Sequence, residues 1–217
     1  MKPNPFLTIW LRPRETIRRI VKWNPNYCVI WLACLAGIAE NLDTFSAGNA
    51  GDKYPSAMII AIALVMGPLV GLVLLWINSL LIRWTGKWIG GTASRKTIRT
   101  ALAWSCVPTA FALLLIIPKL LIAGPELFKA SMPHLDSNPC LWIPFAVLDW
   151  IEVVLVVWSF VTLCHTVAEV QGYRSAWRGL GNFLLVGVVS FAAFLAFGLV
   201  ILAVVFLGGG FKHVVHG

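Results

Sequence analysis

The stretch Gly86–Pro108, GKWIGGTASRKTIRTALAWSCVP, lies between two long apolar runs and decides how the rest of the chain is arranged. Basic residues accumulate in it and just before it: Arg83, Lys87, Arg95, Lys96 and Arg99. Loops rich in Lys and Arg stay on the cytoplasmic side of a membrane. We therefore expect this loop to be cytoplasmic, and every other apolar run can be oriented from it.

The composition places the rest of the chain in a membrane as well. Of its 217 residues, 59% are hydrophobic and only 12% are charged, and its mean hydropathy is +0.84. A soluble domain has about twice that share of charged residues. Because a helix needs about 20 apolar residues to cross a bilayer, the sequence predicts an all-α, polytopic membrane protein, a five-transmembrane-helix bundle. The predicted spans are 27–45, 57–82, 101–123, 141–165 and 180–207.

The basic residues give these spans a direction. If the N-terminus is inside and the C-terminus outside, only Lys53, Lys119, Lys129 and Lys212 of the 17 Lys and Arg lie outside, which leaves 13 inside. Shifting the topology by one span would remove this asymmetry. The connecting loops are too short for a soluble core, so residues 26–211 are predicted to form a single membrane domain. Residues 212–217 are predicted to form a short external tail.

Residues 1–25 are predicted to form a basic, amphipathic cytoplasmic segment. Ile17, Ile20 and Val21 recur at helical spacing, as in a helix that lies in the membrane interface. We expect anionic headgroups of the inner leaflet, and not nucleic acid, to attract the opposite face and the basic loop, because both adjoin apolar spans. The alternative is a solvated basic tail. The basic residues concerned are Arg14, Arg18, Arg19, Lys22, Lys87, Arg95, Lys96 and Arg99.

Asp149 and Glu152 lie three residues apart in the fourth span, so they share one face of a helix, with Ser159 on the same stripe. A carboxylate near the midplane costs roughly 2.5–3.5 kcal/mol on insertion scales, so this face should point into the bundle. Three interpretations stay open: a structural polar cluster paired with Lys119, a cation or proton site, or a neutral, protonated pair. The candidate cluster comprises Glu40, Asp43, Lys119, Asp149 and Glu152.

Two contacts between segments can be predicted. Gly67 and Gly71 form a GxxxG pattern in the second span, which lets another helix approach closely. That helix could belong to a second copy or to another membrane protein. At the inner end, Glu169, Arg174 and Arg178 are expected either to form ion pairs with the Gly86–Arg99 loop or to remain solvated.

No catalytic residue, cofactor or metal site is expected. The chain contains none of the patterns HExxH, GxSxG or GxGD, and its five cysteines show no CxxC spacing. The glycines of GKWIGG also lack the strand and turn that would make them a phosphate-binding loop. The sequence therefore predicts a protein that is not an enzyme.

Four features together resemble the bacterial branch of the Yip1 family. They are RPRETIRRI at residues 12–20, GKWIGG leading into TALAWSCVP, AEVQGYRSAWRGLGN at residues 168–182, and the five predicted spans. The resemblance implies a multi-pass protein of the bacterial inner, or plasma, membrane with no established catalytic activity. Eukaryotic members are tied to vesicle trafficking and Rab-type GTPases, but they have a longer soluble N-terminal region that this chain lacks. The matching positions include Gly90, Gly91, Pro108, Glu169 and Gly172.

Two functions are compatible with these features. The first is a non-enzymatic membrane-organising or partner-binding factor that acts through its basic cytoplasmic face. The alternative is a small cation or proton-coupled transporter or channel that uses the acidic pair of the fourth span. Five spans argue against transport by inverted repeats, because such repeats need matching halves.

Overall fold

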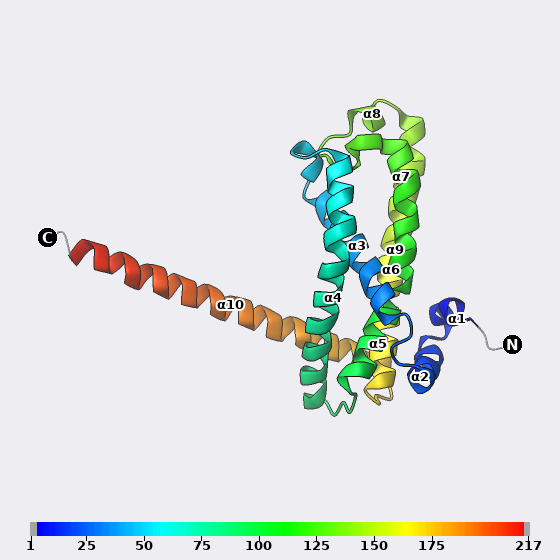
Figure 1. Ribbon diagram of the computed structural model, residues 1–217, viewed down its shortest axis with the longest axis vertical. Helices are drawn as coiled ribbons and strands as arrows, with labels where there is room; N and C mark the ends of the chain where they lie inside the picture. The colour runs from blue at the N-terminus through cyan, green and yellow to red at the C-terminus, as the bar shows by residue number, and fades with distance from the viewer. Residues whose placement is uncertain (1–3, 215–217) are drawn as a thin grey trace.

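The computed structural model describes residues 4–214, which form helices and short connections and contain no strand (Figure 1). The N-terminal helices are α1 (Pro5–Leu11) and α2 (Pro13–Trp23). The long helices are α3 (Val29–Ala47), α4 (Ser56–Trp88), α9 (Pro139–Val170) and α10 (Ala176–Val214). The third span is divided into α5 (Arg95–Ser105), α6 (Val107–Ala112), η2 (Leu113–Leu115) and α7 (Ile116–Ala123). The short elements are η1 (Ala50–Asp52), η3 (Gly124–Phe128) and α8 (Pro133–Asp136). They lie at the end of the long helices that is far from α1 and α2 (Figure 1).

Five segments are long and apolar enough to cross a membrane, as the sequence predicts. The helices are generally longer than the predicted spans: α4 continues to Trp88, and α9 covers residues 139–170. The third span is not one regular helix. Pro108 lies in the first turn of α6, where a missing N–H is tolerated, so α5 ends at Ser105 and a new helix begins.

The GxxxG residues of α4 contact α3 of the same chain. A Cβ on Gly71 would lie 2.1 Å from the carbonyl oxygen of Ala33, and one on Gly37 would lie 2.1 Å from that of Gly67. Glycine is required at this crossing because the two backbones touch. The prediction of a close helix contact is confirmed, but this surface is filled within the chain. The proposed use of Gly67 and Gly71 for a homo-oligomer is corrected accordingly.

The last span departs from the predicted five-helix bundle. Gly179, Asn182 and Val186 near the start of α10 are buried, but the side chains from Phe191 to Val204 are exposed. Figure 1 shows α10 projecting to one side of the other long helices. The helix also runs past Gly208–Gly210, where the sequence predicted its end. Residues 1–3 and 215–217 of the two predicted terminal segments lie outside the described residues.

The N-terminal hairpin of α1 and α2 packs against the bundle instead of standing apart from it. Ile9 and Ile17 are fully buried in one cluster with Trp104 of α5. Phe6 of α1 also packs on Trp104, with 4.8 Å between ring centroids. The apolar face of α2, expected to enter the lipid interface, is therefore covered by protein. Its helical periodicity was informative, but periodicity cannot distinguish a lipid surface from a protein surface.

Candidate functional site

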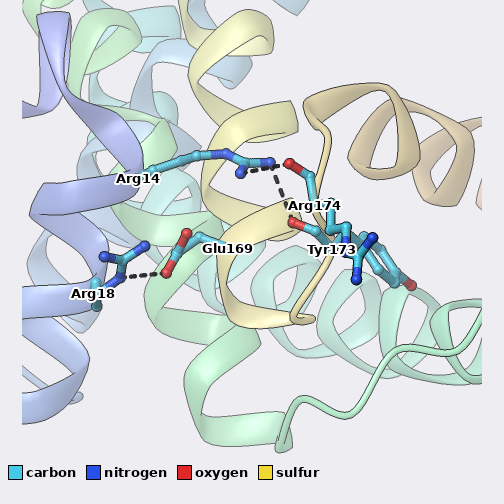
Figure 2. A network of polar contacts seen from close by, with 5 residues as sticks. All are labelled: Arg14, Arg18, Glu169, Tyr173 and Arg174. Atoms are coloured by element: carbon cyan, nitrogen blue, oxygen red, sulfur yellow. Dashed lines mark hydrogen bonds and ion pairs between the residues drawn. The ribbon is translucent and has the colours of Figure 1, made fainter.

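Figure 2 shows how α2 is attached to the end of α9 and the loop that follows it. Nε of Arg18 lies 2.6 Å from Oε1 of Glu169, and this hydrogen-bonded ion pair raises the pKa of Arg18. The guanidinium of Arg14 donates to the carbonyl oxygens of Arg174 and Tyr173 at 3.1 and 3.4 Å. Arg14 and Arg18 lie on successive turns of α2. Arg18 forms an ion pair with α9, and Arg14 donates hydrogen bonds to carbonyl groups of the loop that follows α9.

These contacts correct the predicted pairing of Glu169 with the Gly86–Arg99 loop. Glu169 pairs with Arg18 instead. Arg174 and Arg178 are exposed and form no ion pair among residues 4–204. The Gly86–Arg99 loop is instead contacted by the uncharged side chains of Gln171 and Tyr173. This contact is buried, and an ion pair there would be costly.

Gln171 is the centre of that buried contact, with 2% of its surface exposed. Its Oε1 accepts from the backbone N–H of Ala93 at 3.2 Å, and its Nε2 donates to the carbonyl oxygen of Ile82 at 3.2 Å. Asn182 donates to the same carbonyl oxygen at 3.1 Å and accepts from the Thr85 hydroxyl at 2.6 Å. The end of α4, the basic loop and the start of α10 are therefore tied together by satisfied polar groups.

Tyr173 completes this network. Its hydroxyl donates to the carbonyl oxygen of Gly86 at 3.0 Å. Burial raises the pKa of the phenol, although the positive charge of Arg178 acts in the opposite direction. The phenol therefore remains a hydrogen-bond donor over the whole neutral range.

The glycines of the family-like motifs have distinct roles here. Gly90 and Gly172 have φ angles of +84° and +78°, which L-residues with a Cβ rarely adopt. A Cβ on Gly91 would lie 2.4 Å from Oε1 of Gln171. Pro108 is buried at the start of α6, and Glu169 holds α2. These motif residues shape one end of the molecule.

The eight basic residues predicted to act as one face do not all remain available. Arg14 and Arg18 bind α9 and its loop, while Arg19 pairs with Glu15 at 2.9 Å. Arg99 lies over the ring of Trp76, 4.3 Å from its centroid. The exposed members without an ion pair among the described residues are Lys22, Lys87, Arg95 and Lys96.

A groove lies between α1, α2 and the connection that leads to α3. Its volume is about 600 Å³. Its rim combines positive charge from Arg19 and Lys22 with the aromatic rings of Trp23 and Tyr27, and 69% of Trp23 is exposed. Aromatic side chains and Arg are enriched at surfaces that bind other proteins.

A second polar site lies within the membrane-spanning region. Nζ of Lys119 on α7 lies 2.5 Å from Oδ1 of Asp149 and also forms an ion pair with Glu152, both on α9. Only 11% of the Lys119 side chain is exposed. Asp43 lines a cavity of about 30 Å³ together with Lys119 and Glu152, a volume close to that of one water molecule.

The structure does not bring the whole predicted cluster together. Glu40 is exposed on α3 and forms no ion pair with any residue between 4 and 204. Ser159 accepts from the backbone N–H of Thr109 at 3.1 Å, so it belongs to a separate contact between α6 and α9. The arrangement of Lys119 matches the structural interpretation, because its single ammonium group pairs with both carboxylates of α9.

Sequence reasoning missed the uncharged centre of the basic end. Gln171, Asn182 and Thr85 are ordinary surface residue types, and nothing in their spacing marks them as buried partners. One signal was present. Gly86 and Gly91 bracket the loop, and glycines at such positions often mark close approach of another segment.

Comparison with known proteins supports the relationship that these motifs indicate. A family model described as the Yip1 domain matches residues 7–198. No curated protein and no solved structure matches the chain. The family match begins in α1 and extends into α10, so it includes both the basic end and the intramembrane ion pairs.

Proposed function

The chain belongs to the Yip1 family, and from this premise we propose that it is a non-enzymatic membrane protein that binds partner proteins through its basic end. One observation carries the proposal. The groove between α1 and α2 presents Lys22 and Trp23 on a hairpin that is fixed to the bundle. A rigid surface binds with a smaller loss of conformational entropy than a flexible tail does.

We place the basic end at the cytoplasmic face of a cell membrane, the bacterial inner or plasma membrane. Thirteen of the 17 Lys and Arg lie inside if the C-terminus is outside. Reporter fusions at Lys53, Arg95, Lys129 and Arg174 should report outside, inside, outside and inside. A reversed pattern would place the groove on the wrong side for a cytoplasmic partner.

Crosslinking and affinity capture from native membranes test the partner-binding function. The full chain with Lys22→Glu and Trp23→Ala should lose captured proteins that the unaltered chain retains, because both side chains are exposed and their replacement spares the core. Lys53→Glu is the matched control, since Lys53 is exposed at the opposite end. An identical set of captured proteins for all three chains would contradict the proposal.

A membrane-organising role is the related possibility, with the basic end held by anionic headgroups. Each Lys or Arg close to such a surface contributes about 1 kcal/mol. Cation or proton transport receives less support, because the ammonium group of Lys119 already occupies the position between Asp149 and Glu152. A measured cation or proton flux into vesicles that contain the purified protein would favour the transport alternative.

A further inference from the structure

We propose that the junction of α4 and α5 holds the phosphate group of an anionic phospholipid. A surface cavity of about 400 Å³ lies there, lined by Leu80, Leu81, Arg83, Trp84, Lys87 and Arg95. Its size is within the range of small-molecule sites. The site deepens the proposed function by naming a ligand for part of the basic end, and it rests on that function for its position at the inner leaflet.

The charge in this cavity has no protein counterpart. The nine Asp and Glu of the chain include two at the basic end, Glu15 and Glu169. Both are engaged in ion pairs with basic residues of α2. Arg83, Lys87 and Arg95 form no ion pair among residues 4–204. Three cations thus surround a cavity that an anion would neutralise.

Arg83 supplies the second observation. Its Nε is buried and has no hydrogen-bond partner among the described residues. A buried donor without a partner is destabilising. Arg83 and Lys87 also lie four residues apart on α4, where two like charges repel each other. A phosphate oxygen in the cavity would relieve that repulsion, and guanidinium groups are well suited to phosphate.

The other wall of the cavity indicates why the phosphate should belong to a lipid. Leu80 precedes Arg83 on α4 and Trp84 follows it, and both have exposed apolar surface, 40% and 53% respectively. Tryptophan is enriched at the level of the headgroups. Acyl chains can therefore lie along Leu80 while the phosphate reaches Arg83, Lys87 and Arg95. A free phosphate ion would not need this apolar wall.

Native mass spectrometry of the purified full chain in a neutral detergent tests the site. We expect one tightly bound phosphatidylglycerol, held at least fivefold more tightly than phosphatidylcholine. Arg83→Gln and Lys87→Gln should each weaken phosphatidylglycerol binding by about fivefold. Lys96→Gln is the matched control, because Lys96 adjoins Arg95 and is exposed but does not line the cavity. It should change the affinity less than twofold.

Two results would overturn the proposal. If Lys96→Gln weakens phosphatidylglycerol binding as much as Arg83→Gln and Lys87→Gln do, then the lipid is attracted by the general positive charge and not by a defined site. Binding of inorganic phosphate but not of phosphatidylglycerol would show that the ligand is a free ion. Lys87→Gln keeps the test valid if Arg83→Gln fails to fold, since Lys87 is exposed. Partner capture depends on Lys22 and Trp23, so either proposal can fail without the other.

Discussion

Arg18 and Glu169 are 151 residues apart in the chain, yet Nε of the first lies 2.6 Å from Oε1 of the second. Glu169 is the more enclosed partner, with 16% of its side chain exposed against 57% for Arg18. The pair joins the N-terminal hairpin to the end of α9, beside the carbonyl contacts of Arg14. It therefore adds a charged contact to the apolar packing that holds the hairpin and its groove against the bundle.

Replacing Glu169 with Gln should loosen the hairpin without unfolding the bundle. The amide can still accept a hydrogen bond, but it loses the charge that holds Arg18. Hydrogen exchange of α1 and α2 should become several-fold faster, while exchange of α4 should not change. Glu15→Gln is the control, because Glu15 pairs only within the hairpin region. Unchanged exchange in α2 of the Glu169→Gln chain would show that apolar packing alone holds the hairpin.

The adjacent glycines of the basic loop should respond differently to substitution. Gly90→Ala should cost about 1 kcal/mol because φ is +84°, although no atom lies within 4 Å of the added Cβ. Gly91→Ala should cost about 1–3 kcal/mol, because its Cβ would displace Gln171. Thermal melts in detergent measure both changes.

Gly90→Asn provides the control for that comparison. Asparagine tolerates positive φ better than alanine does, so Gly90→Asn should cost less than Gly90→Ala. Equal losses for these two variants would show that strain at Gly90 is not the cause. A harmless Gly91→Ala would show that Gln171 does not need its observed position.

Tyr173 gives a prediction that depends on pH. Its pKa is raised by burial, and the neutral phenol donates to Gly86. Tyr173→Phe should therefore cost about 1 kcal/mol at pH 7. Because the folded pKa lies above the unfolded value of about 10, this difference is full below pH 10 and disappears as pH rises through the folded pKa. Melts of both chains at pH 8 and at several values above 10 measure it. A difference that grows with pH would have the wrong sign.

The number of spans was predictable because each requires a long apolar run, but α4 and α9 continue past those runs to Trp88 and Val170. Pro108 was visible in the sequence as a residue that can interrupt a helix. Only the structure shows that α5 ends at Ser105 and that α6 begins at Val107. Long-range pairs were harder. Nothing local in the sequence marks Arg18 as the partner of Glu169, since the basic residues around the loop after α4 could equally have paired with this carboxylate.

The intramembrane site shows the same limit. Glu40 and Asp43 lie three residues apart on α3, so the sequence grouped them, yet only Asp43 lines the cavity with Lys119. Both residues are exposed, but the angle between them on the helix is enough that one lines the cavity and the other does not. The path of α10 was not predictable either, because its residues are apolar on all sides and specify no single packing face.

The last prediction concerns the charge balance between α7 and α9. Lys119→Met leaves Asp149 and Glu152 without their shared cation, and breaking a buried pair typically costs about 3–5 kcal/mol. Because 48% of Asp149 is exposed, we expect a loss near the lower end of that range. Adding Asp149→Asn and Glu152→Gln to Lys119→Met should recover part of the stability, since the two amides carry no charge.

Thermal melts of the purified full chain in one detergent compare these variants with Glu40→Gln. That control should behave like the unaltered chain, because Glu40 lies outside the ion-pair cluster. If the cluster is structural, stability should follow the order unaltered chain, triple variant, Lys119→Met, whichever monovalent cation is present. If the melting temperature of the unaltered chain instead depends on the cation supplied, and this dependence is lost in the Asp149→Asn and Glu152→Gln double variant, then the carboxylates bind an ion and the structural interpretation is wrong.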